Sequence, residues 1–363
     1  MASIPPLSRK NERRLFVKTR KPLTHFLQYT TFGVPGTERV KDAVMCDAPI
    51  GYDALFKVNF ALETMMKGIR KAWVAGKHVT IDEIMIRYMG RAISYVQYMP
   101  AKPIKHGIKV FALCCAVLAV ILAFKVYVGK EDDSNGSAAA VCDELCVDAG
   151  LTHQRGRVLY TDNYYTSVKL AKLMFEKYGW TIVGTISPTD KKSHEDEDIQ
   201  LLKLSNGAPL GVKRGWFQEA VLKLKTTTGK PYYQQCTTWR DKKQVCFLHN
   251  SKVVYSYVLS VKRHVKGKKD RVEIDGPKAQ AEYVKYFNAV NRNDRDSANY
   301  STSIRTTRYY IRIMCWVLDR VVHTCFAFAI TVLVWWSSTQ IGNVTRVKTT
   351  AVMTSKSTWA LPS

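Results

Sequence analysis

The sequence predicts an α/β fold in which helices pack on a mixed β-sheet. Between residues 77 and 187 the hydrophobic pattern changes repeatedly, in the order strand, strand, strand, helix, strand, helix, strand. A helical pattern returns from Lys278, and apolar residues make up 46% of the chain. Strands that alternate with helices are typical of a sheet covered by helices, and this apolar content is sufficient for a buried core.

An amphipathic helix is expected from Tyr52 to about Ala75, with Gly76 as its stop. Its apolar side chains recur every three or four residues, at Phe56, Phe60, Leu62, Met65, Ile69 and Trp73. The composition then changes to the β-rich run VTIDEIMIRY, in which apolar positions alternate. This run predicts a strand that carries Asp82.

The apolar run from Phe111 to Phe124 predicts one or two strands in the middle of a covered sheet, because such strands are apolar on both faces. A membrane-spanning helix needs about 20 residues, which is more than this run provides. The run contains no Gly, Asn or Pro to mark a turn. A second apolar run, from Cys325 to Trp336, continues from a helix with charged residues, and we interpret it as the end of an amphipathic helix.

The next elements follow from local signals. A helix is expected to begin after Thr166 or Ser167, whose hydroxyls are good N-caps, and to end at Gly179. A short helix and two short strands complete this region, at residues 141–149, 157–161 and 181–186.

After Pro188 the pattern changes to short alternating runs between turn residues, which predicts a β-rich insertion up to about residue 276. A long helical region follows from Lys278. Its predicted apolar stripe is Tyr310, Met314, Val317, Val321, Cys325 and Phe328. No regular structure is expected after Ser337.

The chain is strongly basic, with 55 Lys and Arg against 30 Asp and Glu and a net charge of +25. This balance indicates a polyanionic partner, and nucleic acid is favoured over an anionic membrane surface. A single basic run is equally consistent with a solvated face, but arginines at helical spacing and nearby aromatic residues favour contact with a DNA backbone. The predicted DNA-binding residues are Lys262, Arg263, Lys266, Lys268, Lys269, Arg271, Arg292, Arg305 and Arg308.

Two aspartates are candidates for a catalytic role, since the common P-loop, serine-hydrolase and zinc-protease motifs do not occur in the sequence. Asp82 lies within the first strand and Asp162 follows the strand VLYT, so parallel neighbouring strands would bring both to one sheet edge. Mg²⁺ prefers carboxylate oxygens, and two such ions about 4 Å apart can activate a water or 3′-hydroxyl against a phosphodiester. A turn or cap role is the alternative for each aspartate.

Several linked motifs resemble those of the piggyBac transposase family. The family's Asp-Glu pair, Gly-Arg, Pro-x-Lys-Pro and Gly-Ile-Lys are matched by DEIMIRYMGR and then YMPAKPIKHGIKVFALC. Its second acidic motif is matched by TDNYYTSVKLAKLM, and its insertion domain by KRGWFQEAVLKLK. Its third acidic stretch aligns without gaps with YVKYFNAVNRNDRDSANY. These matches occur in the family's order and span about residues 50 to 330.

The resemblance implies a ribonuclease H-like catalytic domain with a DDE-type two-metal site. Asp82 takes the place of the family's first catalytic aspartate and Asp162 that of the second. The third position falls on Asn291, a neutral amide that offers a metal one oxygen and no negative charge. On a helix, Asp294 and Asp296 would point about 60° and 140° away from this position, so neither is expected to replace it.

The resemblance also suggests how the chain is divided. We expect a basic, poorly ordered arm (1–40), a helical remnant of the N-terminal domain (41–76), the first part of the ribonuclease H-like core (77–187), a β-rich insertion between the second and third catalytic positions (188–277), C-terminal core helices (278–336) and an unstructured tail (337–363).

The expected cofactor is Mg²⁺ or Mn²⁺, held by Asp82 and Asp162, without zinc. Cys142 and Cys146 have helical spacing but lack two further ligands, and no Cys or His follows Cys325 to form the zinc module that many family members carry. The nine cysteines are expected to be reduced and buried. The expected partner is double-stranded DNA in the nucleus, with a homodimer left open and no membrane.

Three function classes stay open at this point. A transposase-derived DNA-binding protein with an impaired catalytic site is favoured, because Asn291 removes one charge from the metal site. An active cut-and-paste transposase is the alternative and requires Asn291 or a neighbouring carboxylate to support metal binding. A membrane protein requires both apolar runs to face lipid, which their lengths and embedded charges oppose.

Overall fold

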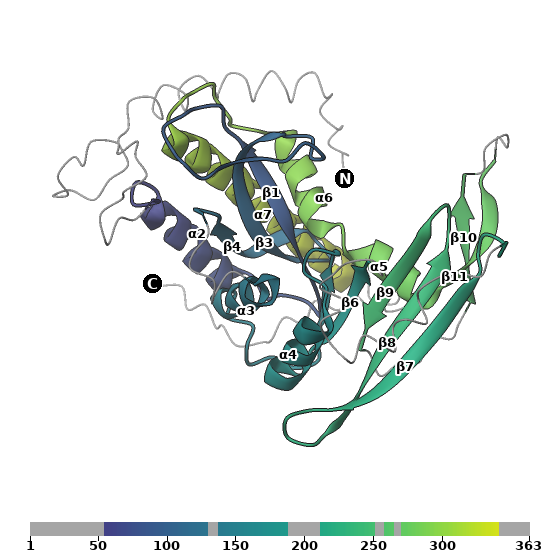
Figure 1. Ribbon diagram of the computed structural model, residues 1–363. Coiled ribbons are helices and arrows are strands. Elements are labelled where there is room, and N and C mark those ends of the chain that lie inside the picture. The colour runs from purple at the N-terminus through teal and green to yellow at the C-terminus, as the bar shows by residue number, and fades with distance from the viewer. Residues whose placement is uncertain (1–53, 130–136, 188–210, 251–257, 265–269, 341–363) are drawn as a thin grey trace.

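The computed structural model describes residues 54–129, 137–187, 211–250, 258–264 and 270–340 (Figure 1). The helices are α2 (Asn59–Ala72), α3 (Ala138–Asp148), α4 (Val168–Tyr178), α5 (Lys278–Tyr286), α6 (Ala289–Ala298) and α7 (Tyr309–Gln340). The strands are β1 (His78–Arg87), β2 (Val96–Tyr98), β3 (His106–Cys115), β4 (Val120–Val126), β5 (Val158–Thr161), β6 (Thr181–Ile186), β7 (Phe217–Lys225), β8 (Pro231–Arg240), β9 (Gln244–His249), β10 (Val258–Arg263) and β11 (Val272–Pro277). The predicted arm at 1–40 lies outside the described residues.

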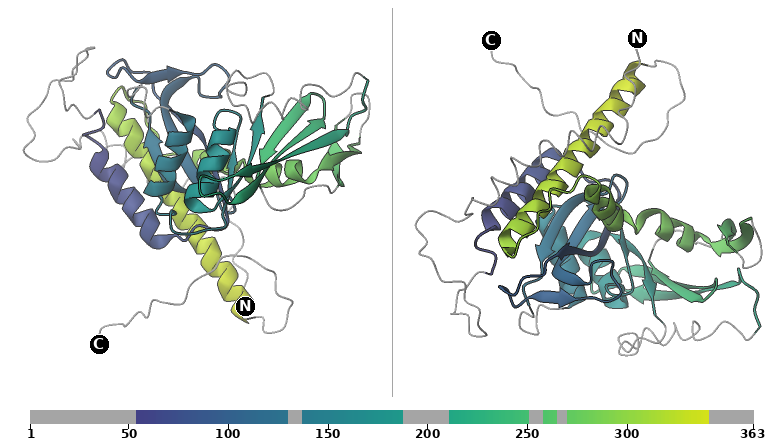
Figure 2. Two further views of the ribbon diagram at one scale, coloured as in Figure 1. Left: turned by 60° about the horizontal axis from the view of Figure 1, so that its bottom comes forward. Right: turned by 90° about the horizontal axis from the view of Figure 1, so that it is seen from above.

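One mixed sheet organises the fold. Its strand order is β2-β3-β1-β5-β6-β9-β8-β7, with β4 paired to β3. β1, β5 and β6 run parallel to one another, whereas the pairs β1–β3, β3–β4 and β6–β9 are antiparallel. Helices pack against this sheet, so the predicted α/β class with a mixed sheet is confirmed (Figures 1 and 2).

Strands β7, β8 and β9 of the predicted insertion extend the same sheet. β9 pairs with β6 through the registers Val183↔His249 and Ile186↔Cys246, and β8 and β7 follow as an antiparallel hairpin. β10 and β11 form a separate two-stranded sheet. The alternating sequence predicted strands here, but it held no signal that they would continue the sheet of the core.

The apolar run at 111–124 forms most of an antiparallel hairpin, β3 and β4, in the centre of the core. Val110, Ala112 and Leu113 are fully buried, which confirms the prediction of sheet core. The turn between the strands is made without Gly, Asn or Pro, and Ala119 adopts a left-handed φ of 56°. This conformation costs a residue with a Cβ about 1 kcal/mol. A hydrogen bond of 2.7 Å from Asn293 Nδ2 on α6 to the Ala119 carbonyl stabilises the turn from outside.

The caps of α4 follow the sequence prediction. The Ser167 hydroxyl accepts a hydrogen bond from the Leu170 backbone N–H at 3.0 Å, and Gly179 ends the helix with a left-handed φ of 64°. Both interactions satisfy backbone groups that the helix itself leaves unpaired. Thr166 instead hydrogen-bonds Thr161 and the Asp162 carbonyl, so it fastens the loop that carries Asp162.

Helices α2 and α7 pack beside one another on the β3–β4 side of the sheet (Figure 2). The buried face of α2 comprises Leu62, Met65 and Ile69, as its periodicity predicts, and also Met66, which was not part of the predicted stripe. Phe60 was also assigned to this face, and that assignment is wrong, because its side chain is 79% exposed. Val58 and Leu62, two residues before and after it, are buried, and at about 100° per residue Phe60 therefore points to the opposite side of the helix.

Most of the buried residues of α7 lie in its first half, and Ala327 is a buried core residue of the second half. Tyr310, Met314 and Val317 are buried as predicted, and the Trp316 ring meets Phe124 of β4 edge-on with centroids 5.0 Å apart. The rest of the predicted stripe is wrong: Val321, Cys325 and Phe328 are exposed, since the helix there extends beyond the sheet (Figure 2). Regular structure also continues past Ser337, to Gln340. The remaining tail lies outside the described residues.

By length and composition, residues Tyr309–Val334 of α7 would be sufficient to cross a membrane, and 22% of their most apolar stretch is buried. The run at 111–124, which the membrane alternative also required to face lipid, is instead sheet core. Among the described cysteines all are free thiols, and all except Cys325 are buried.

Candidate metal centre

The register between β1 and β5 brings the two predicted aspartates to the same level of the sheet. The parallel pairing of β1 and β5 ends with the pair Ile81↔Thr161. Asp82 and Asp162 are the residues that directly follow this pair in the two segments. β1 continues past this point while β5 ends. Asp162 therefore lies in the loop at the carboxyl end of β5, beside Asp82.

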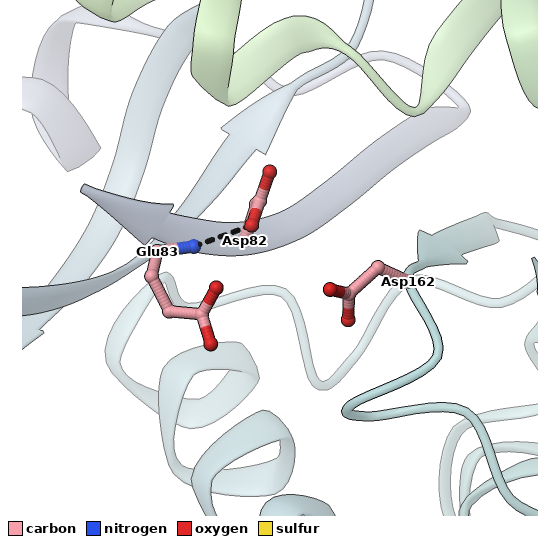
Figure 3. A group of neighbouring side chains, drawn as sticks. All are labelled: Asp82, Glu83 and Asp162. Atoms are coloured by element: carbon pink, nitrogen blue, oxygen red, sulfur yellow. Dashed lines mark hydrogen bonds between the residues drawn. The ribbon is translucent and has the colours of Figure 1, made fainter. Parts of the chain in front are cut away.

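Three carboxylates converge at this point. One carboxylate oxygen from each of Asp82, Glu83 and Asp162 lies within 4.8 Å of the other two (Figure 3). The predicted approach of Asp82 and Asp162 at the sheet edge is confirmed. In Figure 3 the Glu83 and Asp162 carboxylates point toward one another from β1 and from the loop after β5.

Glu83 was not predicted as part of the site. Adjacent residues of a strand point to opposite faces, so a strand carrying Asp82 inward gives no reason to include its neighbour. Asp162 follows the end of β5, and its position in a loop lets its carboxylate approach Glu83 as well. The available signal was the Asp-Glu pair in the motif DEIMIRYMGR.

Asn291 lies on α6 beside the carboxylates, as predicted. Its Nδ2 donates a hydrogen bond of 3.0 Å to Asp82 Oδ2. The two nearby aspartates pair elsewhere: Asp294 accepts from Arg320 Nη2 at 2.7 Å and Asp296 lies 3.4 Å from Arg295 Nε. The expectation that neither replaces the third acidic position agrees with these contacts.

α6 is fixed in place by polar contacts with the β3–β4 turn and with α7. Asn293 is fully buried, donates to the Ala119 carbonyl and accepts from Arg320 Nη1 at 2.8 Å. Arg292 donates to the carbonyls of Ala116 and Val117. Because these two residues directly follow Asn291 on α6, their contacts help to position its amide relative to Asp82.

Two lysines contact the carboxylates. Lys102 Nζ lies 3.7 Å from Asp82 Oδ1 and 3.6 Å from Glu83 Oε2. Lys109 Nζ lies 3.3 Å from Glu83 Oε1 and 4.8 Å from the centre of the Tyr164 ring. Neither lysine was singled out from the sequence, although they are the lysines of the PAKP and GIK motifs. The site therefore contains three carboxyl groups and two ammonium groups that contact them.

The electrostatic environment shifts the pKa values of the three carboxyl groups in different directions, upward for Asp82 and Asp162 and downward for Glu83. Burial raises the pKa of Asp82 to about 7, against the opposing effects of Lys102 and of the Glu83 backbone N–H. Burial also acts on Glu83, but Lys109, the contact with Asp82 and Lys102 hold its pKa below the ordinary value. Burial and the Glu83 charge raise the pKa of Asp162, although the backbone N–H groups of Tyr164 and Tyr165 oppose them.

The predicted DNA-binding residues that the structure describes lie on several different elements, with Arg292 on α6 donating to the Ala116 and Val117 carbonyls. Lys262 and Arg263 lie on β10, at the far end of the molecule from α7 (Figure 1). Arg263 pairs with Asp241 at 3.2 Å and lies over the Trp239 ring. Arg271, Arg305 and Arg308 are exposed, and Lys266, Lys268 and Lys269 lie outside the described residues. DNA contact by these residues stays a prediction.

The family model for transposase IS4 matches residues 39–323 of this chain. The chain therefore belongs to the piggyBac-type transposase IS4 family. No curated protein matches it.

Its fold is similar to a piggyBac transposase in a cryo-EM structure of a synaptic complex with hairpin DNA. The TM-score is 0.60 at 20% sequence identity, and the match covers 76% of this chain and 52% of the other. The chain thus spans about half the length of that transposase. The comparison agrees with the predicted ribonuclease H-like core.

The donor set suits a hard divalent cation. Asp82, Glu83 and Asp162 offer carboxylate oxygens only, as Mg²⁺ and Mn²⁺ prefer. Asp82 and Glu83 are buried, and their carboxylates contact Lys102, Lys109, the Asn291 amide and the Glu83 backbone N–H. The site fits the divalent metal of the transposase family.

Proposed function

We propose that this chain is a transposase-derived DNA-binding protein that has a two-metal phosphoryl-transfer site and is catalytically impaired at Asn291. The observation that carries the proposal is the meeting of Asp82, Glu83 and Asp162 at one sheet edge in a chain of the piggyBac-type transposase family. The expected location is the nucleus, where the DNA substrate is.

The proposed roles follow from position. Asp82 and Asp162 would hold Mg²⁺ or Mn²⁺, with Glu83 as an additional ligand. Bound metal supplies an activated oxygen nucleophile and stabilises the leaving oxygen of the phosphodiester. Lys109, which lies against Glu83 and the Tyr164 ring, keeps the Glu83 carboxylate ionised and oriented toward the site.

Impairment follows from the chemistry of Asn291. An aspartate at this place would add a negative charge to the metal cage, whereas the amide is neutral. Asn291 also uses Nδ2 to donate to Asp82 Oδ2, so one potential ligand oxygen is already engaged. We therefore expect weak metal binding and a low rate of strand cleavage.

A second candidate is an active cut-and-paste transposase. Glu83 favours it, because this residue provides a third carboxylate within 4.8 Å of the other two. If Glu83 compensates for Asn291, the cage retains three negative charges and the loss in rate is small.

Double-stranded DNA is the proposed partner in either case. The net charge of +25 favours a salt-dependent contact with the phosphate backbone. The relative of known structure was captured in a synaptic complex with hairpin DNA, which supports the same class of partner. A homodimer is compatible with this proposal.

The deciding experiment measures nicking and joining of a labelled DNA end by the purified chain in Mn²⁺ or Mg²⁺. Weak, metal-dependent cleavage that Asp162→Asn abolishes, with salt-dependent DNA binding retained, agrees with impairment. Cleavage at the rates of about 1 s⁻¹ or more typical of efficient enzymes, abolished by Glu83→Gln as well as by Asp162→Asn, selects the active transposase. If the chain shows no cleavage and no DNA binding, both candidate functions are refuted.

A further inference from the structure

Lys102 occupies a different kind of position from the other cations of the site. Its ammonium lies within 3.7 Å of two carboxylates from adjacent residues, Asp82 and Glu83. Side chains at adjacent strand positions point to opposite faces, yet the Lys102 ammonium contacts both carboxylates and so bridges them. This bridging position is close to the point where the oxygens of Asp82, Glu83 and Asp162 approach within 4.8 Å.

An ammonium and a divalent cation repel each other at such separations. Even at the dielectric of water, a charge of +1 and a charge of +2 about 4 Å apart repel strongly enough to weaken binding by roughly thirtyfold, and the effect is larger in a partly buried site. The side chains of Asp82 and Glu83 are 11% and 6% exposed, so solvent screening at the site is limited. Lys102 in its present position therefore opposes metal binding.

The Lys102 ammonium can also move away from the two carboxylates. It lies in the loop between β2 and β3, and its side chain is 29% exposed. Backbone hydrogen bonds from Met99 to Lys105 and from Lys102 to Met99 hold the loop, and Pro100 and Pro103 restrict its backbone further. Movement of the ammonium thus needs only rotation of the long side chain.

Lys109 provides the contrast. It lies on β3, its side chain is 12% exposed, and its ammonium is near the rings of both Phe111 and Tyr164. These contacts fix it against Glu83 Oε1 alone. Lys109 is a permanent partner of Glu83, whereas Lys102 bridges two ligands from a solvent-accessible loop.

We propose that Lys102 is an internal counter-cation that occupies the carboxylate site in the metal-free protein and must be displaced for a divalent ion to bind. This inference rests on the proposed metal site and adds the element that regulates its affinity. The ammonium keeps buried carboxylates neutralised until metal is available, because unpaired buried charges are costly.

The test compares Mn²⁺ binding by calorimetry in the full chain and its variants at one pH and ionic strength. Lys102→Met should bind Mn²⁺ about tenfold more tightly or better, as the lost repulsion implies. Lys102→Arg, which keeps the charge, should not tighten binding. Lys105→Met is the matched control, since Lys105 is an exposed lysine of the same loop, and it should bind Mn²⁺ within about twofold of the wild type.

The outcomes separate this inference from the proposed function. Equal or weaker Mn²⁺ binding by Lys102→Met, with binding by the wild type that Asp162→Asn abolishes, refutes the role of Lys102 and leaves the metal site standing. No Mn²⁺ binding by any variant refutes both. If Lys105→Met tightens Mn²⁺ binding as much as Lys102→Met does, the inference is refuted, because the effect would then come from the loss of any nearby positive charge.

A measurement on the wild type avoids dependence on the folding of a variant. Acetylation of individual lysines, followed by mass spectrometry, reports how accessible each amine is. Labelling of Lys102 should increase with Mn²⁺ as the ammonium moves to solvent, while labelling of Lys109 and Lys105 stays constant. Mn²⁺ binding without any increase at Lys102 contradicts displacement.

Discussion

Replacing Asn291 by Asp tests the proposed impairment directly. In the wild type the Asn291 amide donates to Asp82 Oδ2 at 3.0 Å. The Asn291→Asp variant replaces this donor with a carboxylate and so places two acidic groups at hydrogen-bond distance. The change restores the charge that the family's third acidic position would carry.

The metal-free variant should lose stability. A hydrogen bond to a charged acceptor contributes about 1.5 to 3 kcal/mol, and this contribution is lost. Two carboxylates 3.0 Å apart would repel by about 5 kcal/mol at an effective dielectric near 20. The repulsion is relieved because Asp82, whose pKa is already raised to about 7 by burial, takes up a proton that the two groups share.

With metal bound, the same substitution should increase the rate. A carboxylate added to the cage stabilises the cations and the charge that develops in the transition state. If this stabilisation is on the order of 4 kcal/mol, as for a preorganised charge-stabilising group, cleavage rises about a thousandfold. DNA affinity should change little, because the basic residues of the chain are unaltered.

The assay is cleavage and joining of a DNA end in Mn²⁺, together with salt-titrated DNA binding. Asn299→Asp is the matched control, as it makes the same amide-to-acid change at an exposed position at the end of α6. It should leave cleavage unchanged. The reasoning is refuted if Asn291→Asp gives no increase while it binds Mn²⁺ more tightly. Robust wild-type cleavage that Asp294→Ala or Asp296→Ala abolishes would move the third ligand to those residues.

Three further predictions concern the fold. His249 is fully buried, and burial lowers its pKa from 6.5 to about 3, so the native state takes up its proton less readily than the unfolded chain. Its contribution to stability is complete above pH 6.5 and falls by about 1.4 kcal/mol per pH unit as the pH drops toward 3. Urea unfolding at pH 7 and pH 5 should show a steeper loss in the wild type than in His249→Gln, and equal slopes would contradict this assignment. Trp316→Ala should lower the free energy of unfolding by about 3 to 5 kcal/mol, because the ring is buried against Phe124, whereas Phe326→Ala on the exposed half of α7 should cost less than about 0.5 kcal/mol. Similar losses for both in denaturant unfolding would show that the end of α7 is covered. Ser167→Ala should lower the free energy of unfolding by about 1 kcal/mol through loss of the N-cap of α4, and Ser167→Thr should restore most of it; a neutral effect of the alanine in thermal melts would argue against the cap.

The sequence by itself determined the local elements and two of the carboxylates. Period-two and period-3.6 patterns predicted β1, β5, β6 and α4, and Ser167 and Gly179 predicted the ends of α4, because these signals depend only on residues near each other in the chain. Asp82 and Asp162 followed from a related argument, since parallel neighbouring strands can bring a residue within one strand beside the residue that follows the other. The family motifs then assigned the third position to Asn291.

Tertiary structure alone decided which charges complete the site and which apolar surfaces are covered. Glu83 entered the cluster because Asp162 lies in a loop, where strand alternation no longer governs direction. Lys102 reached two carboxylates from a loop whose path the sequence pattern does not specify. Strands β7 to β9 of the insertion joined the core sheet at β6, whereas β10 and β11 formed a separate sheet. The end of α7 extended beyond the core sheet, because an apolar stripe indicates a face suited to burial but does not say whether a partner lies there.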